Sequence, residues 1–142
     1  MKNRIFAFLL ATVFIFSAFA LSSCGKDDDI VTEVRFTCYD NGEGDMVSFY
    51  MTSDVNSFGK WEYSIENKEI FDIFMDSEQT DDYGLFGWGG TASYRTLILN
   101  PTDEGESTVS FNLTDGNMKY DFSVKVTKDS ETEKYKIEVK KK

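Results

Sequence analysis

The chain has no histidine among its 142 residues, and it has only one proline and two cysteines. Without histidine, no side chain has an ordinary pKa close to neutrality. This excludes Ser-His-Asp and Cys-His nucleophile systems and the mixed Cys/His zinc sites. A small hydrolase built on two carboxylates is the remaining enzyme alternative, and its candidate residues are Asp72, Asp76, Glu78, Asp81 and Asp82. No spacing among them indicates a cleft, so we expect no enzyme, metal or cofactor.

Long apolar runs are also scarce, and the main one lies at the N-terminus. Residues Ile5–Leu21 form an apolar stretch behind the basic residues Lys2 and Arg4, which is the pattern of a secretory signal. With 17 residues, the stretch also reaches the lower limit of a membrane span, ~17–25 residues. An ordinary cleaved signal and an uncleaved N-terminal helix are therefore both alternatives to the interpretation that follows.

The four residues after this run, Leu21–Cys24 (LSSC), resemble the bacterial lipobox. In lipoproteins with this motif the signal is cleaved before the cysteine, and the thiol receives a diacylglycerol. The resemblance implies a signal peptide over 1–23, lipidation of Cys24, and membrane attachment through diacylglycerol and acyl chains such as palmitate. Two or more chains are what stable anchoring requires.

A short charged segment, 24–29, follows the cleavage position. Its residues Lys26, Asp27, Asp28 and Asp29 resemble the export signal of Bacteroidetes lipoproteins, which directs them to the cell surface. The resemblance implies an outer-membrane lipoprotein that faces outward. The alternative is a solvated acidic tether on a lipoprotein that faces the periplasm.

Positive charge is scarce in the remainder of the chain. After cleavage, 13 basic and 25 acidic residues give a net charge near −12. This charge argues against nucleic acid as a partner, because nucleic acid binding requires basic patches. Lipidation of Cys24 would leave Cys38 without a disulfide partner, and we expect Cys38 to be a small buried hydrophobic residue.

Alternation of apolar and polar residues dominates the sequence from residue 30 onward. Val109, Phe111 and Leu113 alternate with polar residues, and the turn signal Asp115-Gly116-Asn117 follows them. This pattern predicts antiparallel sheet with one buried face, and 30–142 is long enough for one domain. We expect about 7–9 strands and no long helix. The predicted strands are Ile30–Tyr39, Met46–Thr52, Lys60–Ile65, Ile70–Met75, Ser93–Asn100, Ser107–Leu113, Lys119–Lys128 and Lys134–Lys140.

Two segments resemble bacterial immunoglobulin-like modules of the Big2 type: Gly105–Lys128, which has the closing hairpin pattern, and Trp61–Ile73, which has the middle pattern. The resemblance implies an immunoglobulin-like β-sandwich. A small lipocalin-like barrel is the alternative, because Gly59-Lys60-Trp61 is similar to the Gly-x-Trp signature of that family. We expect loops at Asp76–Thr91 and at Pro101, and a hairpin turn at Asp40–Asp45, whose glycines break a calcium-loop register.

The most unusual local sequence is YGLFGWGG, residues Tyr83–Gly90. Aromatic rings spaced by glycines form a platform that can stack on a sugar or clamp a peptide. The alternative is that these rings complete the core, with glycines at bulges. The candidate ligand-binding residues are Tyr83, Phe86, Trp88, Asp81, Asp82 and Arg95.

We therefore expect a non-catalytic, surface-exposed outer-membrane lipoprotein that binds an extracellular glycan or protein. The alternative is an accessory subunit of an envelope or outer-membrane transport complex.

Overall fold

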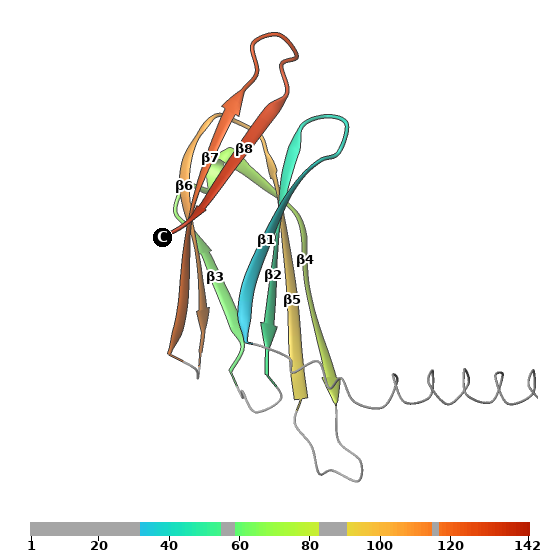
Figure 1. Cartoon of the computed structure of the whole chain (residues 1–142), viewed down its shortest axis with the longest axis vertical. Helices are drawn as coiled ribbons and strands as arrows, with labels where there is room; N and C mark the ends of the chain where they lie inside the picture. Colours follow the sequence, from blue (N-terminus) through green and yellow to red (C-terminus); the bar gives the residue numbers. More distant parts are fainter. Residues whose placement is uncertain (1–31, 55–58, 83–90, 115–116) are drawn as a thin grey trace, which may run out of the picture.

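The computed structural model describes residues 32–54, 59–82, 91–114 and 117–142 (Figure 1). The predicted signal peptide, Cys24, Lys26–Asp29, Tyr83, Phe86 and Trp88 lie outside the described residues. Eight strands and one 3-10 helix (η1, Lys68–Ile70) make up the described part. The strands are β1 Glu33–Asp40, β2 Asp45–Ser53, β3 Trp61–Ile65, β4 Phe71–Asp82, β5 Thr91–Pro101, β6 Gly105–Leu113, β7 Met118–Lys128 and β8 Tyr135–Lys141.

The strands form two antiparallel sheets that pack face to face. Sheet A has the order β1-β2-β5-β4, and sheet B has the order β3-β6-β7-β8. The first seven strands follow the order of constant-type immunoglobulin domains, ABED in one sheet and CFG in the other, and β8 adds one strand beyond the G position. The predicted immunoglobulin-like sandwich is confirmed. The lipocalin-like alternative is wrong, because the sheets do not close into a barrel.

The core lies between the two sheets and follows from the alternation of the strands. Phe49 from sheet A meets Phe111 and Phe122 from sheet B, with ring centroids 4.9 Å and 5.3 Å from that of Phe49. Trp61, at the start of β3, is 1% exposed, and its indole Nε1 donates a hydrogen bond to the Thr52 carbonyl of sheet A at 3.0 Å. The other buried members of this cluster are Val34, Val47, Met51, Ile65, Ile70, Phe71, Leu97, Leu99, Val109, Leu113, Val124 and Val126.

The β1–β2 hairpin confirms the turn predicted at Asp40–Asp45. Asp40 and Asp45 are paired, and the Asn41 N–H bonds to the Gly44 carbonyl at 3.0 Å. Gly42 has φ +94°, and Gly44 has φ +152°, which are conformations that side-chain-bearing residues rarely adopt. Asp45 then bridges to sheet B, where its Oδ2 accepts the Ile137 N–H at 3.0 Å.

Three details of the sequence prediction are wrong. The residues Asp76–Asp82 continue β4 as strand rather than loop, and Pro101 is the last residue of β5. Pro101 is paired with Phe71 at the end of the ladder, where its missing N–H costs little. Cys38 is exposed on edge strand β1. The pKa of its thiol is raised, first by partial desolvation and then by the carboxylate of Asp45.

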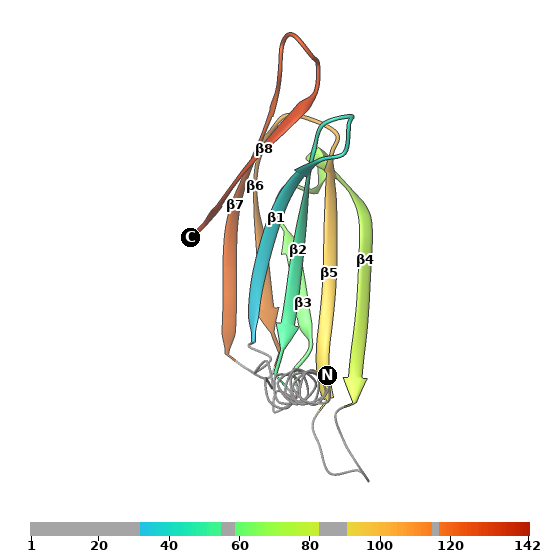
Figure 2. The same ribbon diagram turned by 45° about the vertical axis from the view of Figure 1, so that its right-hand side comes forward.

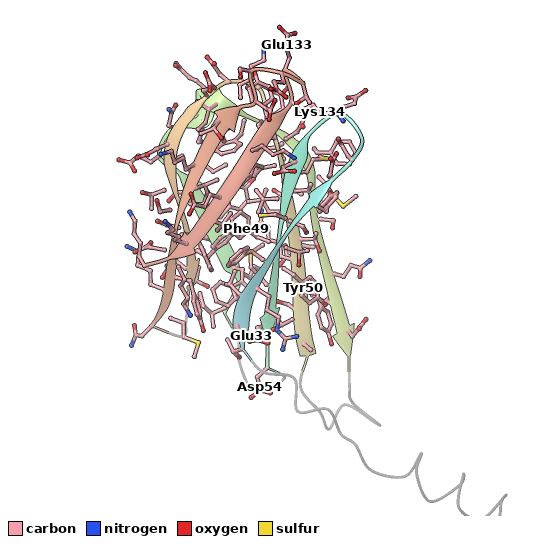
Figure 3. All side chains as sticks on the ribbon, turned by 45° about the horizontal axis from the view of Figure 1, so that its top comes forward. Glu33, Phe49, Tyr50, Asp54, Glu133 and Lys134 are labelled. Carbon is pink, nitrogen blue, oxygen red and sulfur yellow. The ribbon has the colours of Figure 1, made fainter. Side chains whose placement is uncertain are left out.

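The two ends of the sandwich are distinct. The described chain begins beside the end of β4 and the start of β5, whereas the β1–β2 and β7–β8 turns lie at the opposite end (Figures 1 and 2). Figure 3 places Glu33 and Asp54 at the first end, and Glu133 and Lys134 at the second.

Within the described ranges, no helix is long and apolar enough to cross a membrane.

Candidate binding face of sheet A

The outer face of sheet A carries two stacked tyrosines, Tyr50 on β2 and Tyr94 on β5. Their ring centroids are 6.2 Å apart, and the ring planes differ by 19°. Tyr50 is 41% exposed, and it points away from the core because its neighbour Phe49 points into it (Figure 3). Tyr94 also faces outward. Leu97 and Leu99, at odd-numbered positions of β5, are fully buried, and the even-numbered positions of the strand, including Tyr94, face the other side of the sheet.

Strand register places polar side chains around this pair. Tyr50 lies opposite Arg35 on one side and Thr96 on the other, and Tyr94 lies opposite Thr52 and Gln79. Ser77 on β4 lies opposite Thr96. We call this surface the tyrosine face; its members are Tyr50, Thr52, Ser77, Gln79, Tyr94 and Thr96.

The tyrosine face combines aromatic rings with uncharged hydrogen-bonding groups. Hydroxyl and amide side chains both donate and accept hydrogen bonds, which matches the hydroxyl groups of a sugar. An aromatic ring presents a flat apolar surface with a polar tip, which matches the C–H face of a sugar ring. None of the six members is acidic, although the whole chain has 25 acidic residues.

The structure separates the site residues predicted from the sequence. Asp81 is exposed and lies opposite Ala92, on the same side of the sheet as the tyrosine face. Asp82 ends β4 opposite Thr91. Arg95 lies on the other side of sheet A and points toward sheet B, where it bonds to the Trp61 carbonyl. Arg95 and Asp81 therefore do not come together. The predicted aromatic residues belong to Tyr83–Gly90, which lies outside the described residues and connects β4 to β5.

Arg95 is held in a polar cluster that joins the two sheets. Its Nε and Nη2 each donate to the carboxylate of Asp76 at 2.9 Å, and its Nη1 donates to the Trp61 carbonyl at 2.6 Å. The guanidinium carbon lies 5.0 Å from the ring centroid of Tyr63, and the Tyr63 hydroxyl donates to Asp76 at 3.0 Å. We call Tyr63, Asp76 and Arg95 the inter-sheet cluster.

The cluster shifts the pKa of each member. The hydrogen bonds from Arg95, and secondarily that from Tyr63, lower the pKa of Asp76. The Asp76 carboxylate raises the pKa of Arg95. Burial and the bond to Asp76 raise the pKa of Tyr63. The opposite charges of Arg95 and Asp76 are paired, and the Tyr63 hydroxyl has Asp76 as its acceptor. Such mutual satisfaction is typical of a structural contact rather than a catalytic one.

A β-bulge puts Asp76 in this position. The register of β4 shifts between Ile73 and Met75, so Phe74 is the extra residue. Before the bulge Ile73 lies opposite the buried Leu99; after it, Asp76 lies opposite the buried Leu97 and so takes the same side of the sheet. Without the extra residue, Met75 would take the inward position, and Asp76 would face away from Arg95. Bulges commonly redirect a side chain in this way.

A recess lies on the outer face of sheet B. It contains an ion pair between two residues of β7, with Lys119 Nζ 3.2 Å from an Asp121 oxygen. Lys119 and Asp121 lie with Ser64, Ile65, Glu66, Thr108 and Ser110 around the recess, none of which is aromatic. Across the described part of the chain, no three His, Cys, Asp or Glu side chains gather as a metal ion would require.

Neither Tyr50 nor Tyr94 was among the binding residues predicted from the sequence. The alternation of β2 and β5 is sufficient to assign both tyrosines to an outer face, but only the pairing of β2 with β5 brings them together. No protein-family model, curated protein or solved structure matches this chain. The geometry of the tyrosine face is therefore the observation that bears most directly on function.

Proposed function

We propose that the mature chain is a non-catalytic lipoprotein of the outer membrane, displayed on the cell surface, which binds an extracellular glycan on the tyrosine face. The observation that supports it is the stacked pair on the outer face of sheet A, in which Tyr50 is exposed and Tyr94 is half-buried, with hydroxyl and amide neighbours. A buried aromatic pair would only add to the core, whereas this pair presents ring surface to solvent.

The charge of the chain favours a neutral glycan over an anionic one. The net charge near −12 after cleavage repels anionic ligands over distances of about a Debye length, ~8 Å at physiological salt. On the tyrosine face the hydrogen-bonding groups are uncharged. Arg35, on the neighbouring strand, is ion-paired with Glu33, so its charge is offset locally.

The proposed anchor gives the sandwich a defined relation to the membrane. Thr32 is eight positions after Cys24, and eight extended residues span at most about 28 Å. The end at which the described chain begins, which is also the end of β4 and the start of β5 (Figure 1), therefore lies close to the bilayer. The strands of sheet A lead away from it, and their outer face is open to ligands beside the membrane.

Affinity gel electrophoresis against a panel of neutral polysaccharides tests the glycan site. Tyr50→Ala and Tyr94→Ala should each weaken retention about tenfold, because one aromatic contact contributes roughly 1.5 kcal/mol. Tyr39→Ala is the matched control. Tyr39 is 38% exposed and lies on β1 on the same side of sheet A as Tyr50, about 13 Å from Arg35 along the strand. Equal retention of all variants would reject the tyrosine face.

A separate variant tests the loop predicted from the sequence. Trp88→Ala removes the largest ring of Tyr83–Gly90 and leaves the tyrosine face unchanged. Loss of retention in Trp88→Ala would extend the site to this loop, whereas unchanged retention would confine binding to the sheet.

Protease treatment of intact cells tests the location. We expect loss of the protein from whole cells while a periplasmic control protein stays intact, and release of Cys24→Ala from membrane fractions. Protection until the outer membrane is opened would reject surface display, and persistent pelleting of Cys24→Ala would reject the lipid anchor.

A further inference from the structure

Strand β4 is a long edge strand with one open side. It has 12 residues, and among the described strands β5 is its only neighbour in sheet A (Figure 2). An unpaired edge presents a row of N–H and C=O groups that can pair with another strand. Proteins usually protect such an edge with lysine, proline, short length, a bulge or other charged side chains. β4 has a bulge at Phe74 and acidic side chains, but it has no lysine or proline and is long.

The hydrogen-bond pattern shows which groups of β4 are open. Ser93 N–H bonds to Ser53 Oγ, so the odd-numbered residues of β5 point toward β2 and the even-numbered ones toward β4. Glu78 is paired with Arg95, and Thr80 with Ser93. The backbone N–H and C=O groups of Glu78 and Thr80 therefore point away from β5, at the open edge.

The side chains of β4 are apolar at the bulge and acidic elsewhere. Ile73, Phe74 and Met75 are 52%, 65% and 43% exposed. In all, β4 contains five acidic residues and no lysine or arginine. Of the acidic residues of β4, only Asp76 takes part in an ion pair among the described residues. The exposed acidic residues without an ion pair there are Asp72, Glu78 and Asp81.

The charge of β4 determines which kind of strand can pair with its open edge. The tether of this chain contains Asp27, Asp28 and Asp29, and β4 of a second copy is equally acidic, so both are repelled. Strand β8 of a second copy has lysines, but Asp45 already accepts the Ile137 N–H of that strand and lies 3.4 Å from Lys136 Nζ. The first half of the β8 edge is thus covered by its own hairpin.

We infer that the open edge of β4 binds an extended segment of another protein that carries lysine or arginine, and that this segment adds a fifth strand to sheet A. Main-chain hydrogen bonds supply the affinity in such strand addition, and side-chain positions supply the specificity. Here the acidic positions select basic side chains, and the exposed bulge at Phe74 contacts apolar ones. The surface is distinct from the tyrosine face, because it uses the backbone edge of the sheet.

The test uses the full-length lipoprotein in detergent and a nine-residue probe of alternating valine and lysine, with blocked termini. Fluorescence anisotropy should show binding of this probe. The same probe with N-methyl groups along one edge keeps its charge but cannot pair, and it should bind at least tenfold more weakly. Equal binding of both probes would mean general charge attraction and would overturn the inference.

Variants separate the edge from the net charge. Thr80→Pro removes an open-edge N–H without breaking the β5 ladder and should reduce binding about tenfold. Neutralising Asp72, Glu78 and Asp81 as amides should have a similar effect, whereas Glu62→Gln, Glu106→Gln and Glu131→Gln together, with the same net charge, should not. Equal losses in the two triple variants would overturn the inference, as would concentration-dependent self-association through β4 in sedimentation.

Discussion

The inter-sheet cluster allows a quantitative prediction about what holds the two sheets together at the β3–β4 side. The carboxylate of Asp76 and the guanidinium of Arg95 form two parallel bonds, the strong bidentate arrangement. The side chains are 31% and 21% exposed, so the pair lies between an exposed ion pair, ~0–1 kcal/mol, and a buried one, whose disruption costs ~3–5 kcal/mol. We expect Arg95→Ala to cost about 2.5 kcal/mol.

A double-mutant cycle isolates the pair from the rest of the cluster. Urea unfolding of Arg95→Ala, Asp76→Ala and the double variant should give a coupling energy of about 1.5 kcal/mol, within the range for residues in contact. The exposed pair of Lys140 and Glu138, 2.8 Å apart, is the matched control and should show no measurable coupling. A coupling energy for Arg95 and Asp76 equally close to zero would refute the claim that this cluster joins the sheets.

Three further predictions follow from particular residues. Because the pKa of Asp76 is lowered from 3.8, its contribution is present above pH 3.8 and is lost as pH falls through the folded-state pKa; acid titration by circular dichroism should show this loss in the wild type and not in Arg95→Ala. Trp61→Ala should cost about 4 kcal/mol in urea unfolding, and a cost below that of Arg95→Ala would contradict its role in the core. Gly44→Ala should lower the melting temperature more than Gly42→Ala, because its added Cβ lies 3.1 Å from Tyr135 N while Gly42 has open space; the reverse order would mean that the hairpin does not pack on β8.

The fold was predictable because most strands have one buried face. In β6, Val109 and Phe111 are fully buried and Ser110 between them is not, which is the period-two pattern that identifies a strand. β4 lacks this pattern, because the bulge at Phe74 resets the alternation and all residues from Asp72 to Asp81 are exposed. A strand that is exposed on an edge has the composition of a loop, and the second half of β4 was predicted as one.

The candidate site was less predictable, because it depends on pairing between distant strands. Tyr50 and Tyr94 stack only because β2 and β5 are neighbours, and period-two patterns do not specify neighbours. Arg95 was grouped with Asp81 because the two flank the same loop. The register places them on opposite faces, and Asp76, which was not among the predicted binding residues, is the partner of Arg95.

A nuclear magnetic resonance titration tests the central proposal most directly. The backbone amides of the described residues would be followed while a neutral oligosaccharide, taken from the polysaccharide that retains the protein in the affinity gel, is added. Binding on the tyrosine face predicts shifts at Tyr50, Tyr94, Thr96 and Gln79 that saturate together, with none at Lys119 and Asp121 on sheet B. Shifts confined to sheet B, or no shifts with any oligosaccharide of the panel, would contradict it.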